Sequence, residues 1–147
     1  MYIPIHQAYL HAHNQIHGWP LSTTAEVWTA VAGTDWMAHQ NMSFQMSNDG
    51  IATYVGLAQR KFYINYSITF DHDQSAQEVH FIFYKNGIIA AGESGDYKVA
   101  PAQILNISGG EIFELMNGDT IQIYTKTGES GEMSIEHCYL EIILVPT

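Results

Sequence analysis

The sequence predicts an all-β protein, a jelly-roll β-sandwich of two packed sheets with an extended N-terminal arm. Three observations predict this fold class. Short apolar or alternating runs recur along most of the chain, clusters of Gly, Asn and Asp separate them, and no segment keeps a helical period over three turns. We therefore divide the chain into an arm at residues 1–20 and a jelly-roll domain at residues 21–147.

The predicted arm differs from the rest of the chain because residues 1–20 contain no Asp, Glu, Lys or Arg. Pro4 and the Gly18-Trp19-Pro20 break argue against a regular central strand. Such a segment is frayed, folded back on its own domain, or inserted into a neighbour, and its aromatic content argues against disorder. We interpret it as an arm, whose apolar contacts are expected from Tyr2, Ile3, Ile5, Tyr9, Leu10 and Ile16.

The body is predicted to be a series of short strands joined by turns. The clearest hairpin is "FYKNGII", because Asn86 and Gly87 both accept the positive φ of a type I′ turn. Asp119 follows a Gly in another tight corner, so its carboxylate is expected to accept hydrogen bonds from nearby backbone amides. The turn signals, in chain order, lie at residues 48–50, 86–87, 109–110, 117–119 and 128–131.

The stretch "RKFYINYSITF" at residues 60–70 alternates with a period of two, which predicts a strand with two different faces. Its apolar positions, from Phe62 to Phe70, suit a core. The opposite face is polar but uncharged, whereas a strand facing water usually carries Lys and Glu. This face either borders solvent, as antiparallel sheets often do, or contacts another copy of the chain. We favour the contact, made by Tyr63, Asn65, Ser67 and Thr69.

The closing run "HCYLEIILV" is predicted to be a second two-faced strand. Its Cys138 is the only cysteine, so no intrachain disulfide can form, and the apolar neighbours predict a buried free thiol. The two expected faces are Cys138, Leu140, Ile142 and Leu144 on one side, and Tyr139, Glu141, Ile143 and Val145 on the other.

Size and composition limit the possible functions. A chain of 147 residues fits one domain, and its formal charge of −10 opposes binding to nucleic acid, which needs clustered Lys and Arg. Charged residues make up only 14% of the chain against about a quarter in typical proteins, which suggests surface buried between subunits. The start "MYIPIHQAYL" resembles neither a signal peptide nor a membrane span, so we expect assembly in a cytoplasm and no membrane contact.

Candidate chemistry in the sequence is weak, so we predict no enzymatic activity, no cofactor and no metal. His6, His11, His13 and His17 could meet a metal at a threefold axis, but side chains of an amphipathic arm are the favoured interpretation. "DHDQ" offers oxygens for Ca²⁺ but lacks the other ligands and the Gly of a calcium loop, which favours a solvated turn. "GESGD" lacks the second Gly of a nucleophile elbow. The N-x-Ser triplets that begin at residues 41, 65 and 106 are discounted as glycosylation sites because no secretory signal is seen.

From about Trp28 onward, the order of motifs resembles the tumour-necrosis-factor-like family of trimeric jelly rolls, which includes the globular heads of complement. The resemblance is carried by "RKFYINYSITF", "VHFIFYKNG", "ISGGEIFELMNGDTIQIYT" and "HCYLEIILVPT". Within this family, the order "YVG", "RKFYI" and then "YKNG" looks most like that of virion proteins of tailed bacteriophages. The resemblance implies a homotrimer, for which we predict an interface at Tyr63, Asn65, Ser67, Tyr139 and Ile143.

The leading functional hypothesis is therefore a trimeric decoration protein that stabilises a bacteriophage capsid. In this hypothesis the protein lies on the virion surface and its arm docks on the major capsid protein. The alternative is a receptor- or glycan-binding tip of a tail or head fibre, but such a tip normally follows a long stalk, which this chain is not expected to have. A third hypothesis is a cellular adhesion or ligand-like trimer, although no collagen repeat or coiled coil precedes the body.

Overall fold

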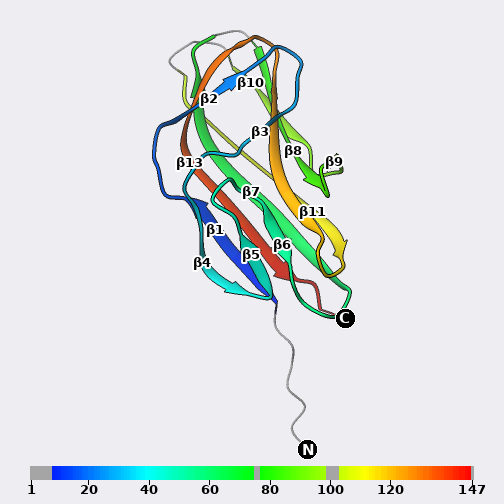
Figure 1. The fold of residues 1–147 in the computed structure, drawn as a ribbon. Helices are drawn as coiled ribbons and strands as arrows, with labels where there is room; N and C mark the ends of the chain where they lie inside the picture. The colour runs from blue at the N-terminus through cyan, green and yellow to red at the C-terminus, as the bar shows by residue number, and fades with distance from the viewer. Residues whose placement is uncertain (1–7, 75–76, 99–102, 147) are drawn as a thin grey trace, which may run out of the picture.

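The computed structural model describes residues 8–74, 77–98 and 103–146, which form a sandwich of two antiparallel sheets (Figure 1). No helix occurs among these residues, so the described part of the chain contains no helix that could span a membrane. The strands are β1 (Tyr9–Asn14), β2 (Trp19–Thr23), β3 (Thr29–Ala30), β4 (Trp36–Met42), β5 (Phe44–Met46), β6 (Ala52–Tyr54), β7 (Arg60–His72), β8 (Gln77–Lys85), β9 (Ile88–Ile89), β10 (Ser94–Lys98), β11 (Leu105–Leu115), β12 (Thr120–Thr127) and β13 (Gly131–Leu144).

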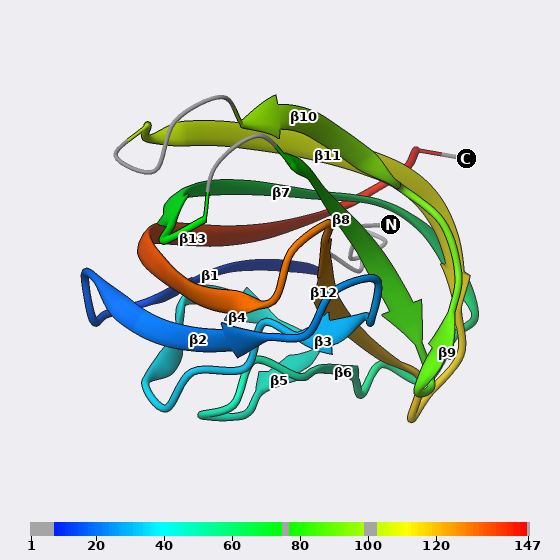
Figure 2. The ribbon, with the colours of Figure 1, turned by 90° about the horizontal axis from the view of Figure 1, so that it is seen from above.

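Strands distant in the sequence lie side by side in both sheets, as a jelly roll requires (Figure 2). Sheet A has the order β11-β7-β13-β1-β4, and β2 pairs with the other end of β13. Sheet B has the order β10-β8-β12-β6-β5, with β3 beside β12 and β9 beside β8. The long strands β7, β11 and β13 form the middle and one edge of sheet A, so this sheet offers a broad, continuous outer face. The predicted all-β jelly roll is confirmed.

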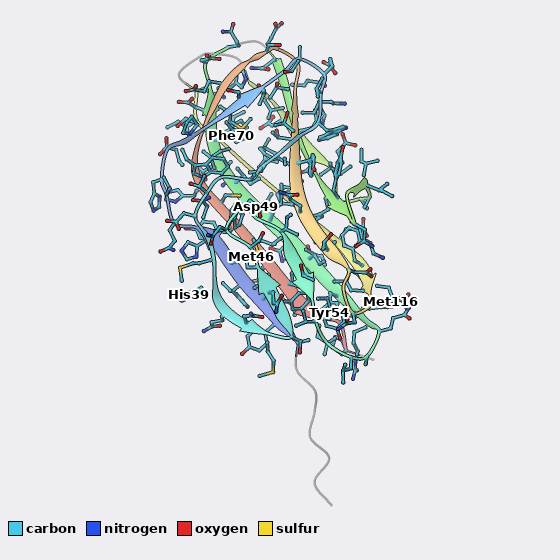
Figure 3. The ribbon with its side chains drawn as sticks, in the orientation of Figure 1. His39, Met46, Asp49, Tyr54, Phe70 and Met116 are labelled. Carbon is cyan, nitrogen blue, oxygen red and sulfur yellow. The ribbon has the colours of Figure 1, made fainter. Side chains whose placement is uncertain are left out.

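The core lies between the two sheets and is built from alternate residues of each strand. In β7 the side chains of Phe62, Ile64 and Ile68 have no exposed surface, as the alternation predicts. Figure 3 shows side chains filling the interior, with Phe70 near one end of the sandwich and Tyr54 near the other. Burial of an apolar side chain of this size stabilises a fold by about 1.5–3 kcal/mol, so this packing fixes the register of the sheets.

The predicted turns are confirmed at the two corners where the sequence was most specific, whereas the turn predicted at residues 109–110 is wrong, because both glycines lie inside β11 and pair with β7. Asn86 and Gly87 have φ angles of 53° and 77°, both in the left-handed region that a type I′ turn needs. At the second corner the carboxylate of Asp119 accepts a hydrogen bond from the backbone N–H of Met116 at 2.8 Å. Asn86 also donates to this carboxylate at 3.0 Å, which ties the two corners together.

The prediction that residues 1–20 form an arm is wrong for the part that the structure describes. Strand β1 lies inside sheet A between β13 and β4, and Leu10 is completely buried in the core. Trp19 begins β2 and is also a core residue. The segment lacks charge because every second side chain faces the core and the others lie on a charge-poor sheet face, not because it leaves the domain. Ile16 is half exposed in the loop after β1, and Tyr2, Ile3 and Ile5 lie outside the described residues.

Candidate functional site

The candidate site is the outer face of sheet A, where the strand register aligns out-facing side chains into rows. One row, here called the apolar row, crosses all five strands in the order Ile112, Tyr63, Ile143, Tyr9 and Met42. Four of its members leave between 43% and 54% of their surface exposed, and Tyr9 is half-buried. A row of large apolar side chains across an open sheet is the kind of surface that a partner covers.

The next row along the strands is polar, and its one carboxylate already has two partners. Glu141 lies between Asn65 on β7 and His11 on β1. Its Oε2 atom lies 3.2 Å from Nδ1 of His11, and its Oε1 atom accepts a hydrogen bond from Asn65 at 3.3 Å. These contacts reduce the cost of removing Glu141 from water, so a partner could cover this row without leaving the carboxylate without hydrogen-bonding partners.

The third row carries small polar and aromatic side chains. Ser67 and Tyr139 are opposite each other on β7 and β13, and His13 follows on β1. Beyond this row, Asn106 of β11 donates to Thr69 of β7 at 2.7 Å. The side chains beyond the apolar row are therefore either hydrogen-bonded across the strands or uncharged hydroxyl and aromatic groups.

The structure brings all five predicted interface residues, Tyr63, Asn65, Ser67, Tyr139 and Ile143, to one continuous surface on the adjacent strands β7 and β13. That this surface contacts other copies stays a prediction. Sequence reasoning missed the flanking residues Ile112, Tyr9 and Met42. The run "EIFELM" contained the signal for Ile112, but Tyr9 was attributed to the arm.

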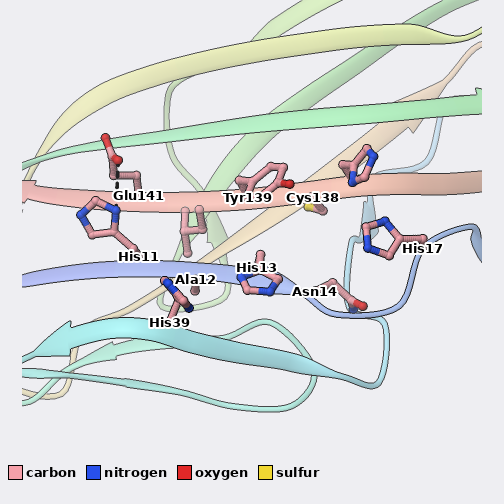
Figure 4. Close-up of a pocket in the computed structure, with 11 residues that line it drawn as sticks. His11, Ala12, His13, Asn14, His17, His39, Cys138, Tyr139 and Glu141 are labelled. Carbon is pink, nitrogen blue, oxygen red and sulfur yellow. Dashed lines mark ion pairs between the residues drawn. The ribbon is translucent and has the colours of Figure 1, made fainter.

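A groove of about 410 Å³ lies on the same face, over the paired strands β1 and β13, and is lined in part by His13 and Tyr139 of the third row (Figure 4). We call it the histidine groove. His13 lies 6.0 Å from His39 of β4 and 6.0 Å from Tyr139, measured between ring centroids. The sequence singled out the histidines of residues 1–17 but could not show that others join them. The histidines that line the groove are His11, His13, His17, His39 and His137.

The other sequence candidates have structural roles. His72 of "DHDQ" is fully buried, with its Nε2 atom 2.8 Å from the Thr23 hydroxyl and its Nδ1 atom 2.9 Å from the side-chain amide of Gln77, so this segment is more than a solvated turn. Ser94 of "GESGD" lies 2.7 Å from the hydroxyl of Tyr66 and helps to bury it. Asn65 and Asn106, two of the N-x-Ser asparagines, hydrogen-bond across strands as described above.

A smaller aromatic cluster lies on the opposite side of the sandwich, on the outer face of sheet B. The rings of Tyr84 and Tyr124 stack at 3.6 Å, with an angle of 6° between their planes. Nearby on β12, the ammonium of Lys126 lies 5.0 Å from the centre of the Trp28 ring. We call these four residues the sheet B aromatic cluster.

Comparison with solved structures identifies the class of fold. The chain is similar to the globular domain of zebrafish complement 1qA, with 12% identity over 95% of this chain and 98% of that chain and a TM-score of 0.62. It is similar to murine APRIL, with 10% identity over 95% of this chain and 100% of that chain and a TM-score of 0.63. It is also similar to the Eiger TNF of S. frugiperda, with 9% identity over 95% of each chain and a TM-score of 0.58.

These similarities show that the chain has the tumour-necrosis-factor-like jelly roll of complement heads. At this level of identity they show the fold alone, since one fold carries many functions. No protein-family model and no curated protein sequence matches the chain. The predicted fold resemblance is confirmed, while the link to bacteriophage virions stays a prediction.

Proposed function

We propose that the protein is a structural subunit without enzymatic activity, which assembles as a homotrimer through the outer face of sheet A. The observation that carries this proposal is the apolar row, flanked by a polar row whose carboxylate is already paired. Five strands about 4.8 Å apart and about eight residues deep form a face of about 600 Å². That area is comparable to the roughly 800 Å² that each partner contributes to a stable interface.

In its specific form, the proposal is that the trimer decorates a bacteriophage capsid and stabilises it. The order of motifs described above supports this role, and the acidic charge of −10 favours a protein partner over the packaged DNA. The partner would be the major capsid protein, contacted by residues 1–7, which retain Tyr2, Ile3 and Ile5 of the predicted docking segment. Three such segments in one trimer would bind a multivalent shell by avidity. The protein would then lie on the virion surface after assembly in the host cytoplasm.

A truncation tests the specific form. The full chain is compared with a chain that lacks residues 1–7. A deletion of residues 1–20 would also remove β1 and the start of β2, which belong to the fold. Light scattering should show a trimer for both. Only the full chain should bind purified heads that lack the protein, and those heads should release DNA at a lower temperature than decorated ones. Full occupancy by the truncated trimer would refute docking through residues 1–7.

A second candidate function, recognition of a receptor or glycan, is favoured by the sheet B aromatic cluster. Aromatic rings with a nearby cation suit the faces and hydroxyls of sugars, and this cluster lies away from the face that we assign to assembly. Replacing Trp28 and Tyr124 by Ala should abolish binding in a glycan array if this function is correct. Heads that lack the protein would then be as robust as decorated ones but would adsorb poorly to cells.

A further inference from the structure

One end of the histidine groove contains two imidazole rings in close contact. His17 lies in the loop after β1, and His137 lies on β13. Their ring centroids are 4.5 Å apart, with an angle of 79° between the ring planes. Both side chains are exposed, so an ion from solution can reach them. The pair adjoins the predicted trimer interface, because the His137 ring lies 6.2 Å from the ring of Tyr139, measured between centroids.

The hydrogen bond of His17 determines which ring nitrogen is available. Its Nδ1 atom lies 3.0 Å from the carbonyl oxygen of Glu136. Because a carbonyl oxygen can only accept, Nδ1 donates in this hydrogen bond, and in the neutral ring Nε2 therefore keeps its lone pair. Metal-binding histidines usually have this arrangement, in which one ring nitrogen donates to a carbonyl or carboxylate and the other coordinates the ion.

The backbone around the pair is shaped by a β-bulge. In the pairing of β13 with β7, Ile135 is opposite Phe70 and His137 is opposite Thr69, so Glu136 is the extra residue. A bulge redirects the side chains beside it, and bulges are frequent near functional sites. Here it presents the Glu136 carbonyl to His17.

The loop that carries His17 is held against the same strand. The backbone N–H of Gly18 donates to the carbonyl of Ile135 at 2.7 Å, and Gly18 has a φ of 73°, which an L-residue adopts only with strain. A Cβ atom at Gly18 would lie 3.6 Å from Oε1 of Glu136. The Glu136 carboxylate therefore lies beside Gly18, the residue that follows His17, and its negative charge favours a cation in this region.

The spacing of the rings fits two ligands of one ion. With metal–nitrogen bonds of about 2.0–2.1 Å, two imidazoles at an angle of about 90–110° have ring centres about 4.5–5 Å apart. Imidazole is a suitable ligand for Zn²⁺, Cu²⁺ and Ni²⁺. Among the described residues, no group of three or more His, Cys, Asp or Glu side chains is arranged to hold a metal, so a site at this pair would have two protein ligands.

We propose that His17 and His137 form a binding site for a divalent transition-metal ion, with Glu136 as the positioning residue. The site is contained in one chain, so it does not depend on the trimer or on any capsid. Binding weakens as the pH falls, because protons compete with the metal for the imidazole lone pairs.

The test is a titration of the full chain with Cu²⁺, which binds most tightly among these ions and reports nitrogen ligands by electron paramagnetic resonance. We expect one ion per chain with the spectral signature of two nitrogens. His17→Ala and His137→Ala should each weaken binding at least about tenfold, since loss of a supporting contact alone costs about 10–100-fold. His80→Ala, which changes a half-buried histidine of sheet B, is the matched control and should leave the affinity unchanged.

The double variant His17→Ala with His137→Ala gives the background binding of all other histidines. Its thermal unfolding should match that of the full chain, because both side chains are exposed. The proposal is refuted if the full chain binds no more Cu²⁺ than the double variant. It is also refuted if His13→Ala or His39→Ala removes the signal while the two primary variants keep it, since the ion would then lie at the other end of the groove.

Discussion

Replacing Ile143 by Asp should separate assembly from folding. In the single chain 44% of the Ile143 side chain is exposed, so it contributes little to the core. Its cross-strand neighbours are Tyr9 and Tyr63, and losing two such contacts should destabilise the fold by about 0.4–2 kcal/mol, at about 0.2–1 kcal/mol each. The larger effect is expected on the trimer, where the remaining surface would become buried.

The size of that effect follows from the exposed fraction. Full burial of an Ile side chain is worth about 1.5–3 kcal/mol, so the exposed 44% is worth about 0.7–1.3 kcal/mol per subunit, or about 2–4 kcal/mol per trimer. This alone weakens association by about 30- to 1,000-fold. The new carboxylate adds to the loss, because it would be buried without a partner on the same strand face as Glu141.

The assay is light scattering at micromolar concentration, with circular dichroism to measure folding. We expect a trimer for the unchanged chain and a folded monomer for Ile143→Asp. Ile88→Asp is the matched control, since Ile88 is 69% exposed on the short β9 of sheet B and should tolerate the charge. A monomeric unchanged chain would refute the trimer. Equal loss of secondary structure and association in Ile143→Asp would show that position 143 belongs to the core.

Three further predictions concern folding. The thiol of Cys138 should react with Ellman's reagent only after unfolding in guanidinium, because complete burial raises its pKa. Burial opposes ionisation of Asp119, but the Met116 amide, Asn86 and Lys85 together lower its pKa. Asp119→Asn should therefore lower the free energy of unfolding by about 1–2 kcal/mol at pH 7, measured by chemical denaturation. The difference should shrink as the pH falls below about 4, where the carboxylate becomes protonated. Tyr66→Phe removes a buried hydroxyl bonded to the carbonyl of Gly92 at 2.9 Å and should lower the free energy of unfolding by about 1–2 kcal/mol.

The strands that the sequence predicted best are those whose two faces meet different surroundings. In β7, the apolar positions are buried and the polar positions lie outward, so a period of two was visible without any knowledge of the partner strands. The Asn86-Gly87 turn was equally predictable, because it depends on the local backbone conformation of two residues. In both cases the determining interactions are close in the sequence.

The N-terminal segment was misjudged because its structure depends on partners far along the chain. Strand β1 pairs with β13, more than 120 residues later, and no local pattern reveals such a pairing. Its sequence "YLHAHN" does alternate, with Leu10 and Ala12 buried, but the histidines between them were taken for the polar side of an arm. Pro20 was correctly expected to avoid a central position, since β2 pairs only with the end of β13.

The bulges that shape the histidine groove could not be predicted either. Glu136 and His39 are each an extra residue in a ladder, the first in β13 against β7 and the second in β4 against β1. A bulge is defined by the register of two strands, so it appears in the sequence only as a break in alternation. The segment "SIEHCY" contains such a break. Ile135 and Cys138 are both buried, whereas in a regular strand residues three apart face opposite sides.

The proposed assembly face and the proposed metal site meet where the ring of Tyr139 lies 6.2 Å from that of His137, but a change at Ile143 should affect only assembly. His137 and Ile143 are six residues apart on β13, a separation of about 20 Å along a strand that rises about 3.3 Å per residue. Two sites that bind different partners influence each other only if one partner changes the other's affinity. At this distance, and with both histidine rings exposed in the single chain, we expect Ile143→Asp to keep the Cu²⁺ affinity within about twofold while abolishing the trimer. A larger fall in affinity, accompanied by loss of a nitrogen ligand from the resonance spectrum, would mean that a neighbouring subunit supplies part of the coordination and that metal binding strengthens assembly by the same factor.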